Sequence, residues 1–169
     1  MDLQGVELER HVGPAQKGDP LAMAALLRGL APWVGRICGS IALDDGDDAM
    51  QETMIRVLKG IRSLREPAAL RGWVRRIAVR EAIKLAQARR DPLLLDRLPE
   101  QAAGDTVEVG ADIADVLRRL TPEQRAILVL RDLEGFSEAE AATLLGVERG
   151  TVKSRLHRAR QAFRRRWSG

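Results

Sequence analysis

The chain has 169 residues, of which 45% are hydrophobic and 31% are charged. This balance excludes a collagen-like or disordered chain and supplies enough apolar side chains for a folded core. A single cysteine, Cys38, excludes an internal disulfide and a thiolate zinc cluster, and we expect it to be a small buried side chain in a reducing compartment. The N-terminus is acidic, and Arg28 and Arg36 interrupt the most apolar stretch, 21–43. We therefore expect neither a signal peptide nor a membrane span.

Charge is unevenly distributed along the chain. Residues 1–90 hold 15 Lys and Arg against 11 Asp and Glu (net +4), residues 91–111 hold 1 against 5 (net −4), and residues 112–169 hold 12 against 8 (net +4). Two tracts are strongly basic: 71–90 has seven basic residues against Glu81, and 149–169 has eight against no acid. One such tract can be a solvated helix face, but two together favour a nucleic acid partner.

Helix signals dominate along the chain, and no convincing run of alternating apolar and polar residues indicates a strand, so the predicted fold is all-α. Asp19-Pro20 is typical of an N-cap and first helical residue, and predicts a helix that continues to about Ile37 with a break near 29–32. The acids at 44, 45, 47 and 48 predict the start of a second helix, because they complement its dipole. A third helix is expected from near Pro67. The expected buried positions of this second and third helix are Met50, Thr53, Met54, Val57, Leu58, Ile61, Leu70, Trp73, Val74 and Ile77.

The segment 91–111 is rich in Pro, Gly and acids, and we expect it to be a flexible linker. It separates a domain at 1–90 from a domain at 112–169. The second domain should open with a short helix around 111–120. Thr121-Pro-Glu-Gln then predicts a capped helix to about Leu133, and Ser137-Glu-Ala-Glu predicts another that ends at Leu145-Gly146. The last helix should begin near Arg149.

Two helices joined at Gly146, the second of them basic, match a helix-turn-helix, whose second helix enters the major groove of DNA. In the last helix the apolar residues recur at spacings of four and three, from Val152 to Phe163. Lys153, Ser154, His157, Arg158 and Gln161 project from the opposite face, where their donors suit phosphates and base edges. A plain surface helix would carry the same residues, so this alternative stays open.

Several segments of the sequence resemble a known family, the extracytoplasmic-function group of bacterial sigma factors in the wider sigma-70 family. The resemblance rests on Thr-Pro-Glu-Gln-Arg at 121–125, Gly-Phe-Ser-Glu-Ala-Glu-Ala-Ala at 135–142, and Gly-Thr-Val-Lys-Ser-Arg-Leu-His-Arg-Ala-Arg at 150–160. The first domain agrees, through Asp-Asp-Gly-Asp-Asp-Ala-Met-Gln-Glu-Thr-Met-Ile-Arg at 44–56 and Trp-Val-Arg-Arg-Ile-Ala at 73–78. Arg80 and Lys84 depart from the Asn and Asp of many members, and Glu148 departs from a frequent Ser.

The resemblance implies a small helical sigma domain 2 and a helix-turn-helix sigma domain 4, joined by an acidic linker. It implies an alternative sigma factor that binds core RNA polymerase and recognises the minus-10 and minus-35 elements of promoters. The residues implied for core polymerase binding are Asp47, Asp48, Gln51, Glu52 and Arg56. Those implied for minus-10 DNA are Arg62, Arg65, Arg71, Trp73, Arg75, Arg76, Arg80 and Lys84. Those implied for minus-35 DNA are Arg149, Thr151, Lys153, Ser154, Arg155, His157, Arg158 and Arg160.

The implied partners are core polymerase and promoter DNA, double-stranded and melted, with an anti-sigma factor left open and no membrane. The chain is expected to be a cytoplasmic, nucleoid-associated monomer with no cofactor, metal or catalytic residue. The acidic linker could imitate RNA in the polymerase or be a soluble spacer. Three alternative functions stay open: a helix-turn-helix regulator that binds DNA without polymerase, a non-initiating sigma-like accessory protein, and an enzyme such as a nuclease that uses the acids at 44–48. The nuclease is disfavoured, because the sequence offers no His-based catalytic site.

Overall fold

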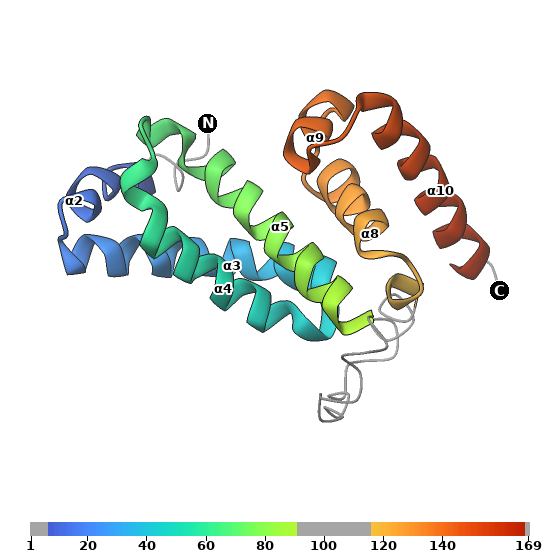
Figure 1. Cartoon of the computed structure of the whole chain (residues 1–169), viewed down its shortest axis with the longest axis horizontal. Coiled ribbons are helices and arrows are strands. Elements are labelled where there is room, and N and C mark those ends of the chain that lie inside the picture. Colours follow the sequence, from blue (N-terminus) through green and yellow to red (C-terminus); the bar gives the residue numbers. More distant parts are fainter. Residues whose placement is uncertain (1–6, 91–115, 168–169) are drawn as a thin grey trace.

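The structure is a computed structural model that describes residues 7–90 and 116–167, and these residues are helical with no strand among them (Figure 1). They form two groups of helices. The N-terminal unit contains α2 (Val12–Gln16), α3 (Pro20–Ala42), α4 (Gly46–Gly60) and α5 (Leu70–Arg90). The C-terminal unit contains α8 (Pro122–Leu128), α9 (Glu138–Leu145) and α10 (Arg149–Trp167). The all-α fold in two helical parts is thus confirmed. The predicted linker 91–111 lies outside the described residues, as does the first half of the short helix predicted around 111–120. In its second half, residues 116–118 are helical.

Helix α3 begins as the sequence predicts, because the Asp19 carboxylate accepts hydrogen bonds from the backbone N–H groups of Leu21 and Ala22. The predicted break near 29–32 is wrong, since α3 continues through Pro32 to Ala42. An internal proline removes a backbone hydrogen bond and costs about 3 kcal/mol. The continuous buried stripe of α3, from Leu26 to Ile41, offsets that cost by packing against α4 and α5.

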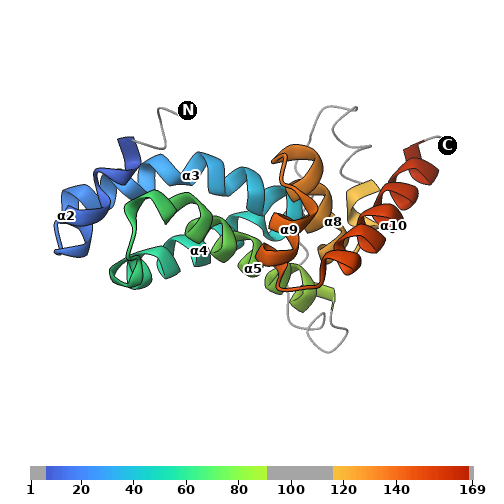
Figure 2. The same ribbon diagram turned by 90° about the horizontal axis from the view of Figure 1, so that it is seen from above.

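By length and composition alone, the stretch that contains α3 is apolar enough to cross a membrane. A core helix of a globular protein meets the same criterion, and α2, α4 and α5 all pack against α3. In Figure 2, α3 runs along one side of α4 and α5. Its most buried side chains are in contact with those neighbours.

Helix α4 follows a 3₁₀ turn, Leu43–Asp45, and carries Asp47 and Asp48 in its first turn, as predicted. Its predicted buried stripe is largely confirmed at Thr53, Val57 and the following Ile61, whereas Leu58 is 49% exposed and was wrongly placed there. Helix α5 follows the 3₁₀ turns Ile61–Ser63 and Pro67–Ala69. Its Leu70 and Val74 are fully buried, and Trp73 and Ile77 are partly buried against the same core.

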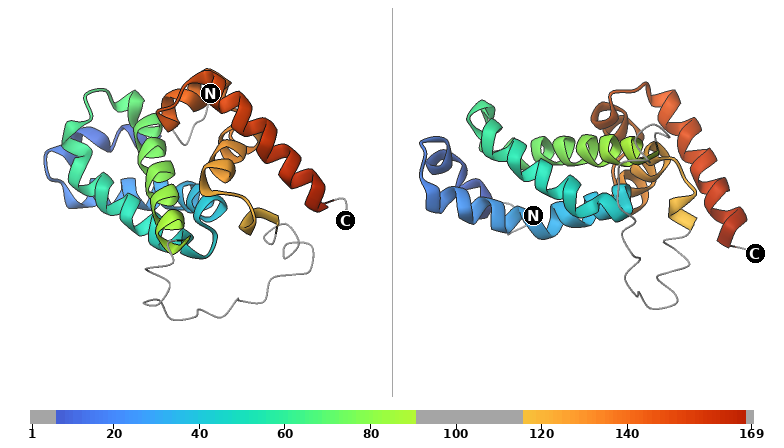
Figure 3. Two further views of the ribbon diagram at one scale, coloured as in Figure 1. Left: turned by 45° about the vertical axis from the view of Figure 1, so that its right-hand side comes forward. Right: turned by 60° about the horizontal axis from the view of Figure 1, so that its bottom comes forward.

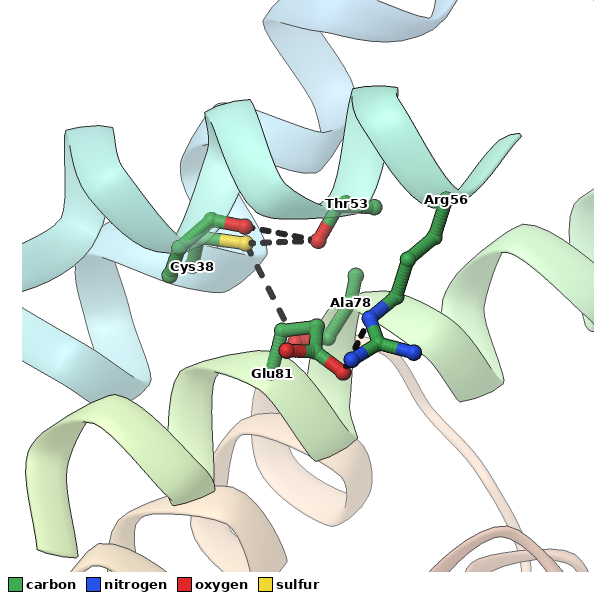
Figure 4. A network of polar contacts seen from close by, with 6 residues as sticks. Cys38, Thr53, Arg56, Ala78 and Glu81 are labelled. Atoms are coloured by element: carbon green, nitrogen blue, oxygen red, sulfur yellow. Dashed lines mark hydrogen bonds and ion pairs between the residues drawn. The ribbon is translucent and has the colours of Figure 1, made fainter. Parts of the chain in front are cut away.

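A buried polar network joins α3, α4 and α5 (Figure 4). Thr53 donates its hydroxyl to the backbone oxygen of Ala49 at 2.7 Å and lies 3.9 Å from the Cys38 sulfur, which is also 3.9 Å from the Ala78 oxygen. Burial raises the pKa of the Cys38 thiol to about 11, so the thiol is inert at neutral pH. Cys38 is thus the small buried side chain that the sequence predicts.

The C-terminal unit follows its predicted caps closely. Both capping boxes are present, one between Thr121 and Gln124 and the other between Ser137 and Glu140. The first helix reaches Leu133 as predicted, although its last five residues form a π-helical turn. Helix α9 ends at Gly146, whose φ of +65° is a left-handed conformation that glycine adopts without strain. This turn sets the direction of α10.

The two units are packed against each other, with α8 and α9 of the C-terminal unit on the α5 and α3 side of the N-terminal unit (Figure 3). Arg125 of α8 is 3% exposed and donates its Nε to the backbone oxygen of Ile41 in α3 at 2.5 Å. Gln87 of α5 donates to the Glu123 carboxylate of α8. An exposed ion pair, Arg118 with Asp44 at 3.2 Å, adds a further link.

Candidate nucleic-acid and polymerase interface

The outer face of α10 presents four exposed side chains close together: Lys153, Ser154, His157 and Arg158. The opposite face is buried through Val152, Leu156 and Ala159, which fixes the rotation of the helix about its axis. The predicted stripe and outward face of this helix are therefore confirmed as geometry. Arginine, lysine, serine and histidine side chains on one exposed helix face can donate to phosphates and to base edges.

The other predicted minus-35 residues lie differently. Arg149 forms an ion pair with Glu138 of α9 at 3.4 Å, and Arg160 forms one with Asp132 of the π-helical turn at 2.5 Å. The Asp132 carboxylate raises the pKa of Arg160 further above its ordinary value. Thr151 and Arg155 are half-buried. These four residues flank the exposed centre of α10.

The predicted minus-10 residues divide into an exposed group and an occluded pair. Arg76, Arg80 and Lys84 are spaced by four residues and form one exposed stripe along α5. Arg62 and Arg65 are exposed in the loop that precedes the helix, and the half-buried ring of Trp73 lies against Gly60. Gln16 of α2 anchors this loop by donating to the backbone oxygens of Ile61 at 3.0 Å and Leu64 at 2.6 Å.

Arg71 and Arg75, the occluded pair, turn from this stripe toward α3 and the C-terminal unit. The guanidinium carbon of Arg75 lies 4.9 Å from the ring centroid of Trp33 and 4.4 Å from that of Phe136, and that of Arg71 lies 5.4 Å from Trp33. Glu134 accepts from Arg75 at 3.3 Å and from the Trp33 indole nitrogen at 3.4 Å. Burial lowers the pKa of Arg75 from its ordinary value, although the Glu134 carboxylate opposes that shift.

Trp33, Glu134 and Phe136, which contact Arg75, were not predicted from the sequence as members of a site. Trp33 lies in the apolar helix predicted from Pro20, and its contact with Glu134 joins residues about a hundred positions apart. The sequence does place Gly135 between an acid and an aromatic residue, in the segment between two predicted helices. A glycine at such a place indicates a turn, but it does not indicate what the flanking side chains contact.

Helix α4 presents its acids and amide outward. Asp47, Asp48, Gln51 and Glu52 are exposed, as predicted for a docking face. Arg56 is half-exposed, and its Nε lies 2.7 Å from the carboxylate of the buried Glu81 (Figure 4). Two apolar side chains on the same exposed face were not predicted: Ile55 is 40% exposed and Leu58 is 49% exposed. The face therefore combines negative charge with a small apolar area.

An apolar pocket of about 450 Å³ lies between α8, the π-helical turn and α10, and Ser40 of α3 closes it on one side. Its lining is Ser40, Leu117, Arg125, Leu128, Val129, Asp132, Leu133, Arg160, Phe163 and Arg164. Leu133 at its edge is 72% exposed. Within residues 7–90 and 116–167, no group of three or more His, Cys, Asp or Glu side chains is placed to hold a metal ion.

Comparison with protein families gives two matches, in the order of the two units. Residues 24–91 match the family described as Sigma-70 region 2, and residues 111–163 match Sigma-70, region 4. The sigma factor SigM of Mycobacterium tuberculosis is 39% identical over 125 residues, which cover 72% of this chain and 64% of SigM. SigE of Mycolicibacterium smegmatis is 36% identical over 132 residues, and the match spans 51% of its length. This chain therefore spans less than two thirds of these two relatives.

A further relative matches over nearly its whole length. SigL of Mycobacterium tuberculosis, also an ECF RNA polymerase sigma factor, is 32% identical over 164 residues, which cover 87% of this chain and 92% of SigL. Among solved structures, RpoE bound to the anti-sigma factor NepR from Bartonella quintana has a TM-score of 0.66 at 24% identity, covering 82% of this chain and 92% of RpoE. CnrH with the cytosolic domain of CnrY has a TM-score of 0.64 at 24% identity, covering 92% and 93%. With region 2 and region 4 in the order of the two helical units, this chain belongs to the extracytoplasmic-function sigma factors of the sigma-70 family.

Proposed function

We propose that this protein is an alternative sigma factor, which binds core RNA polymerase and directs promoter-specific initiation through minus-10 and minus-35 elements. One observation carries the proposal. Two exposed cationic faces, on α5 and on α10, lie in separate units, and an acidic and apolar face on α4 is also exposed. A regulator that binds DNA alone would need only α9 and α10, and would leave the α4 face without a role.

Helix α10 is assigned to duplex DNA at the minus-35 element. Its exposed centre contains two cations and two side chains that can both donate and accept, which is the chemistry that major-groove reading requires. Arg149 and Arg160, already paired with Glu138 and Asp132, are better suited to phosphate contacts at the edge of the interface. We assign Arg158 and Lys153 the largest share of direct DNA contacts.

The exposed α5 stripe and the preceding loop are assigned to melted DNA at the minus-10 element. Single strands bind to cations that follow the backbone and to aromatic rings on which bases stack. Arg76, Arg80 and Lys84 supply the cations along α5, and the partly exposed Trp73 supplies a ring beside them. The hydrogen bonds from Gln16 hold the loop with Arg62 and Arg65 in place.

The exposed α4 face is assigned to core polymerase. Its carboxylates can meet a basic partner surface, where complementary charge accelerates association and fixes the register. Ile55 and Leu58 add apolar area that would be covered on binding. Glu81, buried behind Arg56, holds that guanidinium in a defined direction at the edge of the face.

The decisive experiment is an anisotropy titration of labelled full-length protein with core RNA polymerase from a related bacterium. We expect a nanomolar Kd, and the double variant Asp48→Lys/Glu52→Lys should weaken binding by about tenfold or more, which corresponds to about 1.4 kcal/mol. A control variant, Glu66→Lys/Glu148→Lys, makes the same change in net charge at exposed positions away from α4 and should bind as the unmodified protein does. Absence of binding to a matched core, together with good DNA affinity, would favour the stand-alone regulator instead.

The remaining assignments follow from the same proposal. The protein acts without a cofactor or a catalytic site of its own, because a sigma factor leaves the chemistry to polymerase, and we place it in the cytoplasm as a monomer when free. An anti-sigma factor is a further proposed partner. Of the two similar solved structures, RpoE is bound to the anti-sigma factor NepR, and CnrH is bound to the cytosolic domain of CnrY. A non-initiating accessory role predicts core binding without transcripts in a reconstituted assay, and this outcome separates it from the leading proposal.

A further inference from the structure

The apolar pocket of about 450 Å³ lies where α8 packs against α10 (Figure 1). Sites for small molecules in proteins have volumes of about 300–1,000 Å³ and a mostly apolar lining with a few polar groups. The apolar part of this lining consists of Leu117, Leu128, Val129, Leu133 and Phe163. Leu133 is 72% exposed, and Leu117, Leu128 and Phe163 are half-buried. These side chains therefore keep apolar surface that a bound molecule would remove from water.

The charged side chains of the lining are three arginines and one acid. Arg125 contributes to the fold, because it donates to three backbone oxygens. Arg160 is paired with Asp132, whose two oxygens lie 2.5 Å from its Nη2 and 3.3 Å from its Nε. Arg164 follows Arg160 by one helical turn, so it lies on the same side of α10, and it is exposed. Within residues 7–90 and 116–167 no acid forms an ion pair with Arg164, so this guanidinium can accept a bound anion.

We propose that this pocket binds a small aliphatic carboxylate, whose chain covers the leucines and Phe163 and whose carboxylate accepts hydrogen bonds from Arg164. A guanidinium matches a carboxylate, because the two groups can form two parallel hydrogen bonds. A methylene group is about as large as a water molecule, which takes up about 30 Å³ of the liquid. A volume of about 450 Å³ therefore has room for a chain of about ten carbon atoms. The proposal goes beyond the sigma factor assignment and does not depend on it.

The test is isothermal titration calorimetry of the full chain with decanoate, at concentrations at which decanoate forms no micelles. We expect a one-to-one complex with a Kd of about 10–100 µM, which is an ordinary affinity for a ligand of about 12 non-hydrogen atoms. Hexanoate has the same charge and a shorter chain, and it should bind at least about tenfold more weakly. Decylamine has the same chain and a positive charge at neutral pH, and it should also bind at least about tenfold more weakly.

Two pairs of variants test the charged part and the apolar part of the site. Arg164→Glu removes the proposed partner of the carboxylate, whereas Arg165→Glu makes the same change at the next residue, which is exposed and does not line the pocket. Leu133→Glu places a carboxylate on the apolar lining, whereas Leu21→Glu makes that change at a leucine of α3 that is 79% exposed and lies outside the pocket. Arg164→Glu and Leu133→Glu should each weaken decanoate binding at least about fivefold, and each control should change it by less than about twofold.

All four changes are made at exposed positions, so circular dichroism should show a folded helical protein in each case. The absence of a binding signal with decanoate, or equal binding of decanoate and decylamine, would refute the carboxylate ligand. Equal effects of Arg164→Glu and Arg165→Glu, or of Leu133→Glu and Leu21→Glu, would refute its location. The competing occupant is a second copy of the chain. Dimers that Leu133→Glu dissociates in sedimentation analysis, without decanoate binding, would overturn the proposal in favour of that occupant.

Discussion

Arg125 provides a direct test of how buried hydrogen bonds stabilise α8 against its neighbours in both units. Its guanidinium is buried and donates to three backbone oxygens: Ile41 at 2.5 Å, Leu117 at 3.1 Å and Leu120 at 2.8 Å. Arg125→Met keeps much of the side-chain volume but removes all the donors. A buried acceptor left without its partner costs about 1–3 kcal/mol. We take about 1 kcal/mol for each carbonyl, because water can reach the partly buried ones, and expect a loss of about 3 kcal/mol in the free energy of unfolding.

Urea denaturation of the full chain, followed by circular dichroism, measures this loss directly. Arg125→Lys is the informative second variant, since one ammonium group keeps the charge but cannot reproduce the arrangement of Nε and Nη1 donors. We expect it to recover only part of the lost stability. Arg158→Met is the matched control, because Arg158 is exposed on α10 and the same change there should cost less than about 0.5 kcal/mol. A loss below about 1 kcal/mol for Arg125→Met would refute the inferred role of the three hydrogen bonds.

Three further predictions concern single side chains. Ser137→Ala should destabilise the chain by about 1 kcal/mol in urea denaturation, because it removes the hydroxyl that accepts the Glu140 N–H. The Ser137 hydroxyl also lowers the pKa of the Glu140 carboxyl from its ordinary value, so the part of the loss that depends on this carboxylate should disappear as pH falls through the lowered pKa, whereas a loss that grows in acid would contradict the assignment. Burial raises the pKa of the Cys38 thiol from 9.0 to about 11, so this thiol should react with a disulfide reagent only when the protein unfolds, and rapid labelling of the native chain would contradict this. The contribution of the protonated thiol to stability is complete below pH 9.0 and is lost as pH rises through 11, a pH dependence that Cys38→Ala should lack. Arg158→Ala should weaken binding to a cognate minus-35 duplex by 1–3 kcal/mol if Arg158 reads a base, or lower the salt dependence by about one counterion if it contacts a phosphate; unchanged affinity and salt dependence would remove Arg158 from the interface.

Local features of this fold could be predicted from the sequence because each depends on residues that are close in the chain. The N-cap at Asp19 and the capping boxes at Thr121 and Ser137 each involve donors within three positions. The turn at Gly146 and the outward face of α10 follow from one glycine and one helical repeat. The continuity of α3 through Pro32 could not be predicted in this way, since it depends on packing against α4 and α5, which local preference does not contain.

The candidate site was predicted only in part for the same reason. The cations of α5 were identified by type, but type does not separate Arg71 and Arg75 from Arg76 and Arg80. Their separation depends on the direction in which each points once α3 and the C-terminal unit are packed. The contact between Trp33 and Glu134 spans 101 positions and has no local signature. The exposure of Leu58 also depends on the fold, because an apolar residue at helical spacing is normally buried.

The arrangement of α5 leaves room for the proposed DNA contacts beside those that hold the fold together. Its inner face packs into the core through Leu70, Val74 and Ala78, which leaves two sides for other contacts. One side carries the exposed stripe that includes Arg76 and Arg80, and the other carries the cations covered by the C-terminal unit.

The packing of the two units therefore covers only part of the cationic surface, and the exposed cations of α5 and of α10 stay accessible. The molecule should still associate with DNA through these exposed charges, weakly and with strong salt dependence. Glu134 and Phe136 cover Arg75 on the second side of α5, so removing them should add one cation to the surface that DNA can reach. Glu134→Gln/Phe136→Ala should therefore bind short single-stranded DNA more tightly than the unmodified chain does, and binding to a minus-35 duplex should stay unchanged. Equal affinity of the two proteins for the single strand would contradict this expectation.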